Sequence, residues 1–97
     1  MTFRVKTLPK AEADIRSITN YIYERSSQGA EAWLNAYRRA RLRLADNAET
    51  YGEADENEHF DIDVRQALFK TRHGRFYRLL FTIVGDEARI LRVRGSG

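Results

Sequence analysis

The chain has 97 residues, 42% of them hydrophobic, which is enough for one domain with one core and too few for two. It has no cysteine and only two histidines, so a disulfide framework and a thiolate metal site are excluded and a zinc site is disfavoured. No apolar run approaches the roughly 20 residues of a membrane span, and the N-terminus lacks the apolar segment of a signal peptide. We therefore expect one soluble, cytoplasmic domain over residues 1–97, with no metal or other cofactor.

The formal net charge of +3 is unevenly distributed along the chain. Residues 1–63 hold 9 Lys/Arg and 12 Asp/Glu, a net of −3, whereas residues 64–97 hold 8 and 2, a net of +6. A basic C-terminal third suits a partner that carries negative charge. That partner can be a nucleic acid or an acidic peptide, and composition does not choose between them.

The chain begins with a predicted strand and a predicted helix. Residues 2–8 alternate apolar and basic side chains, and Pro9 ends this strand while suiting the first position of a helix. From residue 9 to about residue 25, apolar side chains recur at three- and four-residue spacing, which predicts an amphipathic helix. The side chains on its core face are Ala11, Ile15, Ile18 and Ile22.

A second helix is predicted over residues 30–47. Ser26, Ser27 and Gly29 break the first helix, and either serine can cap the second, so the two helices form an antiparallel hairpin. Trp33 and Tyr37 would also suit base stacking, but their spacing beside alanines favours the core. The predicted core stripe is Ala30, Trp33, Tyr37, Ala40 and Leu44.

Residues 49–63 form an acidic segment. They hold seven of the fourteen acidic residues and no Lys or Arg, which predicts a solvated loop between the helices and a sheet. Two alternatives stay open. The carboxylates could bind a divalent cation, although the ligand ladder and the glycine of a calcium loop are missing. The loop could instead lie over the basic sheet as an electrostatic cover.

Residues 64–94 predict a three-stranded meander. Three runs rich in β-branched and aromatic residues are separated by short gaps centred on Gly74 and Gly85, which is typical of two consecutive hairpins. His73 lies in the first gap, where its pKa would suit a general base, but a turn residue beside Gly74 is the favoured interpretation. A one-residue change in the turn at Gly85 would move Arg92 and Arg94 between the two faces of the sheet.

The middle strand of this meander is amphipathic. Its large apolar residues at positions 77, 79, 81 and 83 predict one buried face. The opposite face carries Arg78 and Thr82 beside Leu80, and this mixed surface is a candidate contact surface.

The element order predicts an α+β fold, β-α-α-β-β-β. If the helical hairpin crosses one face of the sheet and returns, the first strand enters at an edge beside the last strand. The result is a four-stranded, mainly antiparallel sheet of order 1-4-3-2, with helices on one face. The other face, toward which Arg78 points, is expected to be open.

Two parts of the sequence carry a family likeness. The first predicted helix begins Leu8-Pro9-Lys10-Ala11-Glu12-Ala13-Asp14-Ile15 and continues with Ile18 and Tyr21-Ile22. The last two strands carry Tyr77-Arg78-Leu79-Leu80-Phe81 and Ile90-Leu91-Arg92-Val93-Arg94. In this order the motifs resemble the RelE/ParE toxin superfamily, over nearly the whole chain. The resemblance implies the toxin half of a type II toxin–antitoxin pair.

The RelE branch of this superfamily consists of ribosome-dependent mRNA endonucleases. Such an enzyme needs cations around the scissile phosphate and a basic side chain that assists proton transfer. Arg78 matches the strand arginine of the family, and Lys70 lies near the place of a catalytic lysine. The resemblance therefore gives Arg78, Lys70 and one of Arg65 or Arg92 as the candidate catalytic set.

The ParE branch acts by binding DNA gyrase and supplies no catalytic chemistry. The endonuclease pattern continues beyond the last strand, whereas this sequence ends with Arg94-Gly95-Ser96-Gly97, and the long helix pair is more similar to ParE. The leading hypothesis is therefore a ParE-like gyrase poison in a toxin–antitoxin hetero-oligomer. The acidic, helical C-terminal segment of the antitoxin would pack along the helices and the basic sheet. The candidate contact residues are Arg78, Leu80, Arg92 and Arg94.

Two simpler hypotheses stand beside these. Arg78, Arg92 and Arg94 could only keep an exposed sheet face soluble. The domain could also poison nothing and serve as an adaptor, or as an orphan paired with a regulator, although such a module would be expected to lose the basic face.

Overall fold

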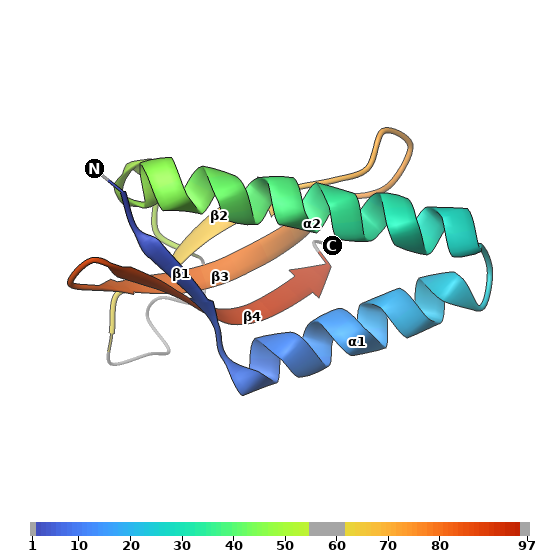
Figure 1. The fold of residues 1–97 in the computed structure, drawn as a ribbon, viewed down its shortest axis with the longest axis horizontal. Coiled ribbons are helices and arrows are strands. Elements are labelled where there is room, and N and C mark those ends of the chain that lie inside the picture. Colours follow the sequence, from blue (N-terminus) through green and yellow to red (C-terminus); the bar gives the residue numbers. More distant parts are fainter. Residues whose placement is uncertain (1, 55–61, 96–97) are drawn as a thin grey trace.

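The computed structural model describes residues 2–54 and 62–95, in which two helices pack on one face of a four-stranded sheet (Figure 1). This is the predicted α+β order, and none of its described helices has the length and apolar character needed to cross a membrane. The elements are β1 (Arg4–Thr7), α1 (Pro9–Tyr23), α2 (Ser27–Asn47), the short 3-10 helix η1 (Ala48–Thr50), β2 (Arg65–Phe69), β3 (Tyr77–Val84) and β4 (Glu87–Gly95).

The helices α1 and α2 form the predicted antiparallel hairpin. Ser26 caps α2, because its Oγ accepts a hydrogen bond from the N–H of Gly29 at 2.9 Å. A Cβ at Gly29 would lie 3.2 Å from the Ile22 side chain, so the missing side chain permits a close approach between the helices. This cap makes α2 begin three residues earlier than the apolar stripe predicts.

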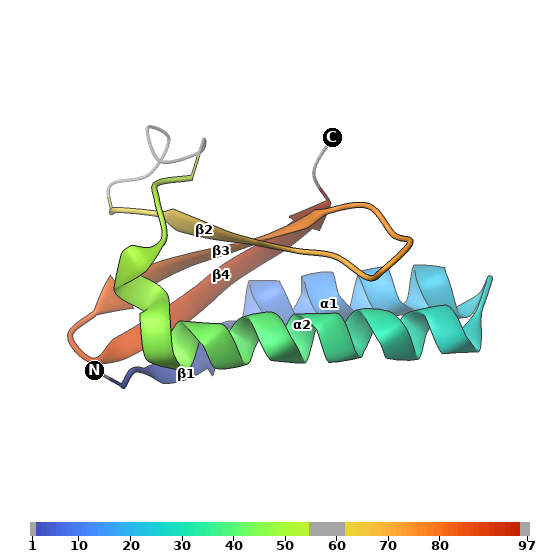
Figure 2. The same cartoon turned by 90° about the horizontal axis from the view of Figure 1, so that it is seen from above.

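The strand order β1-β4-β3-β2 confirms the prediction. β1 lies parallel beside β4, and the pairs β4–β3 and β3–β2 are antiparallel. The hairpin carries the chain over one face and back, which leaves β1 and β2 at opposite edges. Figure 2 shows both helices on the same side of the sheet.

The main core lies between the helices and this first face of the sheet. Trp33 is 2% exposed, and its ring centroid is 5.5 Å from that of Phe69 and 5.4 Å from that of Tyr77. Tyr37 is buried as well and stacks on Trp33. These rings therefore stabilise the core, as their spacing predicts, and the base-stacking alternative for Trp33 and Tyr37 is wrong.

A β-bulge fixes which residues of β4 face away from the helices. Leu80 of β3 is opposite Arg92 and Phe81 is opposite Ile90, which leaves Leu91 as the extra residue. Paired residues share a face, so Arg92 lies on the second face with Leu80, and Arg94 lies there opposite Arg78. The register thus settles the ambiguity that the turn at Gly85 leaves in the sequence.

The second face is less open than the sequence predicts. Leu80 is 0% exposed and packs with Ala54, Val64 and the partly buried Leu91, and Thr82 is buried too. The segment after η1 crosses the β2 edge to reach this face, as Figure 2 shows. The expectation of an open surface is therefore wrong at Leu80, because a segment interpreted as solvated loop contributes an apolar residue that covers it.

The acidic segment is only partly described, and residues 55–61 lie outside the described residues. Its first part contributes Ala54 to the second face, where the Ala54 N–H donates to the Val64 carbonyl at 2.8 Å. Within residues 2–54 and 62–95, no three His, Cys, Asp or Glu side chains lie close enough together to hold a metal ion. The electrostatic-cover alternative stays a prediction, since most of the acids that it needs fall within 55–61.

Candidate binding groove along strand β4

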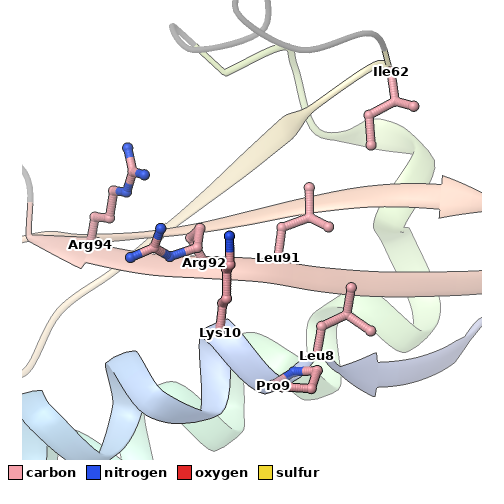
Figure 3. A pocket seen from close by; sticks show the side chains of 7 residues that line it. All are labelled: Leu8, Pro9, Lys10, Ile62, Leu91, Arg92 and Arg94. Atoms are coloured by element: carbon pink, nitrogen blue, oxygen red, sulfur yellow. The ribbon is translucent and has the colours of Figure 1, made fainter.

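An apolar groove with basic side chains lies along β4 on the second face (Figure 3). Its volume is about 480 Å³. Leu8 and Pro9 come from the junction of β1 and α1, and Leu91 comes from the bulge of β4. We call this site the β4 groove and define it by its lining residues, Leu8, Pro9, Lys10, Ile62, Leu91, Arg92 and Arg94.

A second hollow of about 480 Å³ continues the β4 groove toward the β3–β4 turn. It shares Leu8, Ile62 and Leu91 with the β4 groove and reaches Val84 and Arg89 at its other end. Its lining is also largely apolar. Together the two hollows form an elongated apolar surface with arginines at both ends, a shape suited to a peptide segment.

Asp14 of α1 holds Arg92 in place at the rim of the β4 groove. Its carboxylate accepts hydrogen bonds from Arg92 Nε at 2.8 Å and from Arg92 Nη2 at 3.0 Å. The same carboxylate accepts the backbone N–H of Val93 at 2.9 Å. This geometry fixes the plane of the Arg92 guanidinium. It also gives the Val93 N–H of β4 an acceptor at a point beyond the end of β1, where no described strand lies along this side of β4.

These contacts shift the acid–base equilibria of both side chains. Partial burial raises the pKa of Asp14, but the hydrogen bonds from Arg92 and Val93 outweigh it, so this pKa lies below its ordinary value. The hydrogen bond to Asp14 raises the pKa of Arg92. Both groups are therefore charged at neutral pH.

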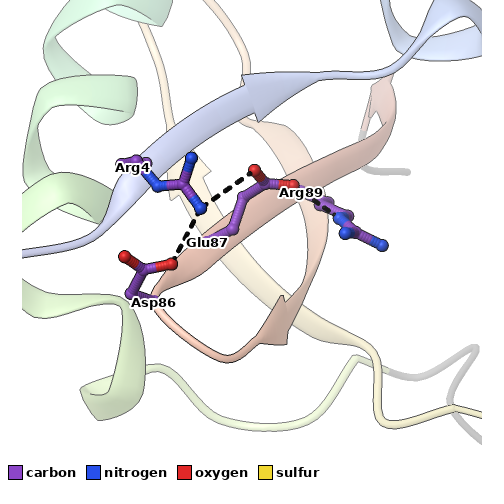
Figure 4. Close-up of polar contacts among 4 residues, drawn as sticks. All are labelled: Arg4, Asp86, Glu87 and Arg89. Atoms are coloured by element: carbon purple, nitrogen blue, oxygen red, sulfur yellow. Dashed lines mark hydrogen bonds and ion pairs between the residues drawn. The ribbon is translucent and has the colours of Figure 1, made fainter.

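The acids of the meander are engaged elsewhere. Asp86 and Glu87 are the only acidic residues from residue 64 to residue 97. Arg4 Nη2 lies 2.9 Å from Asp86 Oδ1 and 3.7 Å from Glu87 Oε2, and Arg89 also pairs with Glu87 (Figure 4). This surface network ties β1 to the β3–β4 turn, so it does not neutralise the cations of the β4 groove.

Another hollow lies outside the second face, between β1 and α2. Its volume is about 520 Å³, and it is lined by Phe3, Val5, Arg38, Arg41, Leu42 and Ala45. Leu42 is 69% exposed there. This hollow provides a comparison site for the β4 groove, because it also combines apolar residues with arginines.

Comparison with known proteins decides the family. A model of the family described as "ParE toxin of type II toxin-antitoxin system, parDE" matches residues 5–97. The chain belongs to the ParE toxin family. The fold is also similar to a solved structure titled "Chromosomal ParDE TA system from P. aeruginosa", with a TM-score of 0.74 and 21% identity. That match covers 99% of this chain and 98% of the other. No curated protein matches.

The structure separates one of the endonuclease candidates, Arg65, from two of the others. Arg78 and Arg92 lie on the second face, but Arg65 is opposite Phe81 and so lies on the helix-facing side. Arg65 Nη1 donates to the Glu49 and Tyr51 carbonyls, both at 2.9 Å. Arg65 therefore holds η1 in place and does not join Arg78 and Arg92 in one cluster.

The remaining predicted residues lie around the second face or in turns. Arg78 is partly buried, and its Nη1 contacts Gln66 Oε1 at 3.4 Å. Lys70 follows β2, with its Nζ 5.4 Å from the Phe76 ring centroid. His73 lies in the turn before β3, which confirms its interpretation as a turn residue.

Sequence reasoning missed six residues of this site. Asp14 positions Arg92, and five more line the β4 groove, namely Leu8, Pro9, Lys10, Ile62 and Leu91. The approach of α1 to β4 follows from β1 lying beside β4, which was predicted. Placing the start of α1 against the end of β4 would have suggested Lys10. The bulge that brings Leu91 to this face has no signal in the sequence.

Proposed function

We propose that this ParE-family toxin inhibits growth by poisoning DNA gyrase in the cytoplasm, and that a cognate antitoxin neutralises it by binding in the β4 groove. The family match over residues 5–97 carries this proposal. The action is binding, not catalysis. Arg65, one of the endonuclease candidates, lies on the opposite side of the sheet from Arg78 and Arg92, so it would not contribute to a phosphate site beside them.

The β4 groove suits an amphipathic, acidic helix of the antitoxin. Leu8, Pro9 and Leu91 offer an apolar floor, which an apolar helix face would bury. Lys10, Arg92 and Arg94 surround this floor, and Asp14 pairs with Arg92. This rim of three cations and one carboxylate carries net positive charge, which acidic side chains beside the apolar face would complement. The antitoxin and the chain would then form a hetero-oligomer through this surface.

A supercoiling assay with purified gyrase tests the proposed activity. We expect the purified chain to inhibit supercoiling and stabilise cleaved DNA, and prior mixing with the antitoxin to abolish both effects. An in vitro translation reaction on ribosomes serves as the matched control and should be unaffected. Unchanged supercoiling at saturating toxin, in a preparation that still stops growth of the cells expressing it, would refute gyrase as the target.

A further inference from the structure

The edges of the sheet differ in what covers them. Along the outer edge of β1, the Phe3 N–H donates to the Ala45 carbonyl at 2.7 Å, and Arg41 Nη2 donates to the Val5 carbonyl at 2.9 Å. Beyond the end of β1, Asp14 accepts the N–H of Val93 in β4. Helices α1 and α2 therefore protect this side of the sheet against pairing with another chain.

The opposite edge, formed by β2, is covered only in its first part. Glu53 pairs with Arg65, and the Gln66 N–H donates to the Gly52 carbonyl at 3.1 Å. Backbone groups alternate in direction along a strand, so the N–H and C=O of Leu68 point outward like those of Gln66. Within residues 2–54 and 62–95, no hydrogen bond reaches Leu68 from this outer side. The edge at Leu68 thus presents a donor and an acceptor for a further strand.

The side chains around this edge indicate which segment would fit it. Leu68 is 49% exposed, and the nearby Phe76 is exposed as well. From residue 66 to residue 85 the sequence contains four Lys/Arg and no Asp or Glu. An incoming strand would therefore meet apolar side chains on a strongly basic background. A second copy of this chain is a poor occupant, because it would bring two such basic edges together.

We propose that the outer edge of β2 at Leu68 binds an extended, acidic peptide segment of a partner protein as an added strand. The existing pairing of Glu53 with Arg65 shows that this edge accepts an antiparallel neighbour. Backbone hydrogen bonds at Leu68 would position the peptide, apolar residues would cover Leu68, and acidic residues would face the surrounding cations. This site is separate from the β4 groove and does not depend on gyrase being the target.

A synthetic peptide of about ten residues that alternates Glu and Val is the probe. Its control has the same sequence with every backbone nitrogen methylated, which keeps the charges and removes the strand hydrogen bonds. In the full chain, we expect the unmethylated peptide alone to slow amide exchange of Leu68 in NMR spectra. Equal binding of both peptides, or unchanged exchange at Leu68, would overturn the proposal.

The variant Leu68→Pro provides a second test of the proposed binding at the β2 edge. Its lost N–H points away from β3, so the sheet should tolerate proline at this edge, and thermal melting should stay close to that of the parent chain. We expect at least tenfold weaker binding of the Glu-Val peptide. If Leu68→Pro melts normally and binds as tightly as the parent, or if ultracentrifugation shows a dimer that this variant abolishes, the proposal is wrong.

Discussion

The two faces of the sheet are built from the same strands but differ in what they hold. The first face buries Trp33, Phe69 and Phe81 against the helices in one continuous core. The second face buries a small cluster around Leu80 and places Arg92 and Arg94 at the rim of the β4 groove. Because successive side chains of a strand point to opposite faces, one face of the sheet supplies the main core and the other, in our proposal, supplies the surface that binds the antitoxin. Substitutions in the buried clusters of either face should therefore lower stability, whereas substitutions in the β4 groove should weaken binding.

The largest expected effect is on the first face, with Trp33→Ala. Removing a fully buried aromatic ring should lower the free energy of unfolding by about 3–5 kcal/mol, a large part of the stability of a small domain. Urea denaturation followed by circular dichroism measures it. The control Leu42→Ala shortens an exposed side chain and should change the free energy by less than about 0.5 kcal/mol. Equal effects of the two variants would contradict the assignment of the main core.

Leu80→Ala tests whether the second face is covered. Its side chain is fully buried, but the cluster around it is small. We expect a loss of about 2–3 kcal/mol in the same denaturation experiment. A loss below about 0.5 kcal/mol would mean that this side chain is exposed in solution, as the sequence alone predicts.

Asp14→Asn should have an intermediate effect and a clear pH signature. It weakens hydrogen bonds to Arg92 and Val93, so we expect a loss of about 1–2 kcal/mol at neutral pH. The native pKa of Asp14 lies below its ordinary value of 3.8, so the native state binds fewer protons than the unfolded state. This contribution is complete above that ordinary value and is lost as the pH falls through the native pKa.

Denaturation of Asp14→Asn and the parent chain at neutral pH and below pH 3.8 measures this dependence. The stability difference between the two proteins should shrink as the solution becomes acidic. The exposed carboxylate of Asp46, changed in Asp46→Asn, provides the control. A difference that stays constant across this pH range would exclude the Asp14 contacts as its cause.

The smallest effect is expected for Arg4→Ala, in the surface network of Figure 4. The Arg4 side chain is largely exposed, and its ion pair with Asp86 is screened by water and salt. The melting temperature should change slightly in dilute buffer and not at all in about 1 M salt. A large decrease that persists in salt would show that this network holds β1 in place.

Periodicity in the sequence accounts for most of the fold. The spacing of Ala11, Ile15, Trp33 and Leu44 predicts both helices and the faces that they bury, and alternation in β3 predicts the buried Phe81. The strand order follows from these elements, because short connections and one covered face leave few alternatives. The helix bounds at the hairpin turn were predicted less accurately. Helix α1 ends at Tyr23 and not near residue 25, and α2 begins at Ser27 and not at residue 30, because its Ser26 cap lies outside the apolar stripe.

The second face was harder to predict because its contacts join distant parts of the chain. Arg92 and Asp14 are 78 positions apart, and neither position has a local pattern that points to the other. Ala54 covers Leu80 from within a segment whose composition predicts solvated loop. The bulge at Leu91 then moves one residue of β4 onto this face. Tertiary packing, not local propensity, therefore determines the shape of the β4 groove.

The affinity of the cognate antitoxin for Leu91→Asp, compared with Leu42→Asp, tests the central claim most directly. The first variant places a carboxylate on the floor of the β4 groove, and the second places one in the hollow between β1 and α2. Isothermal titration calorimetry should show at least tenfold weaker binding for Leu91→Asp and unchanged binding for Leu42→Asp, with both variants folded by circular dichroism. Unchanged affinity of folded Leu91→Asp, or a loss confined to Leu42→Asp, would contradict antitoxin binding along β4.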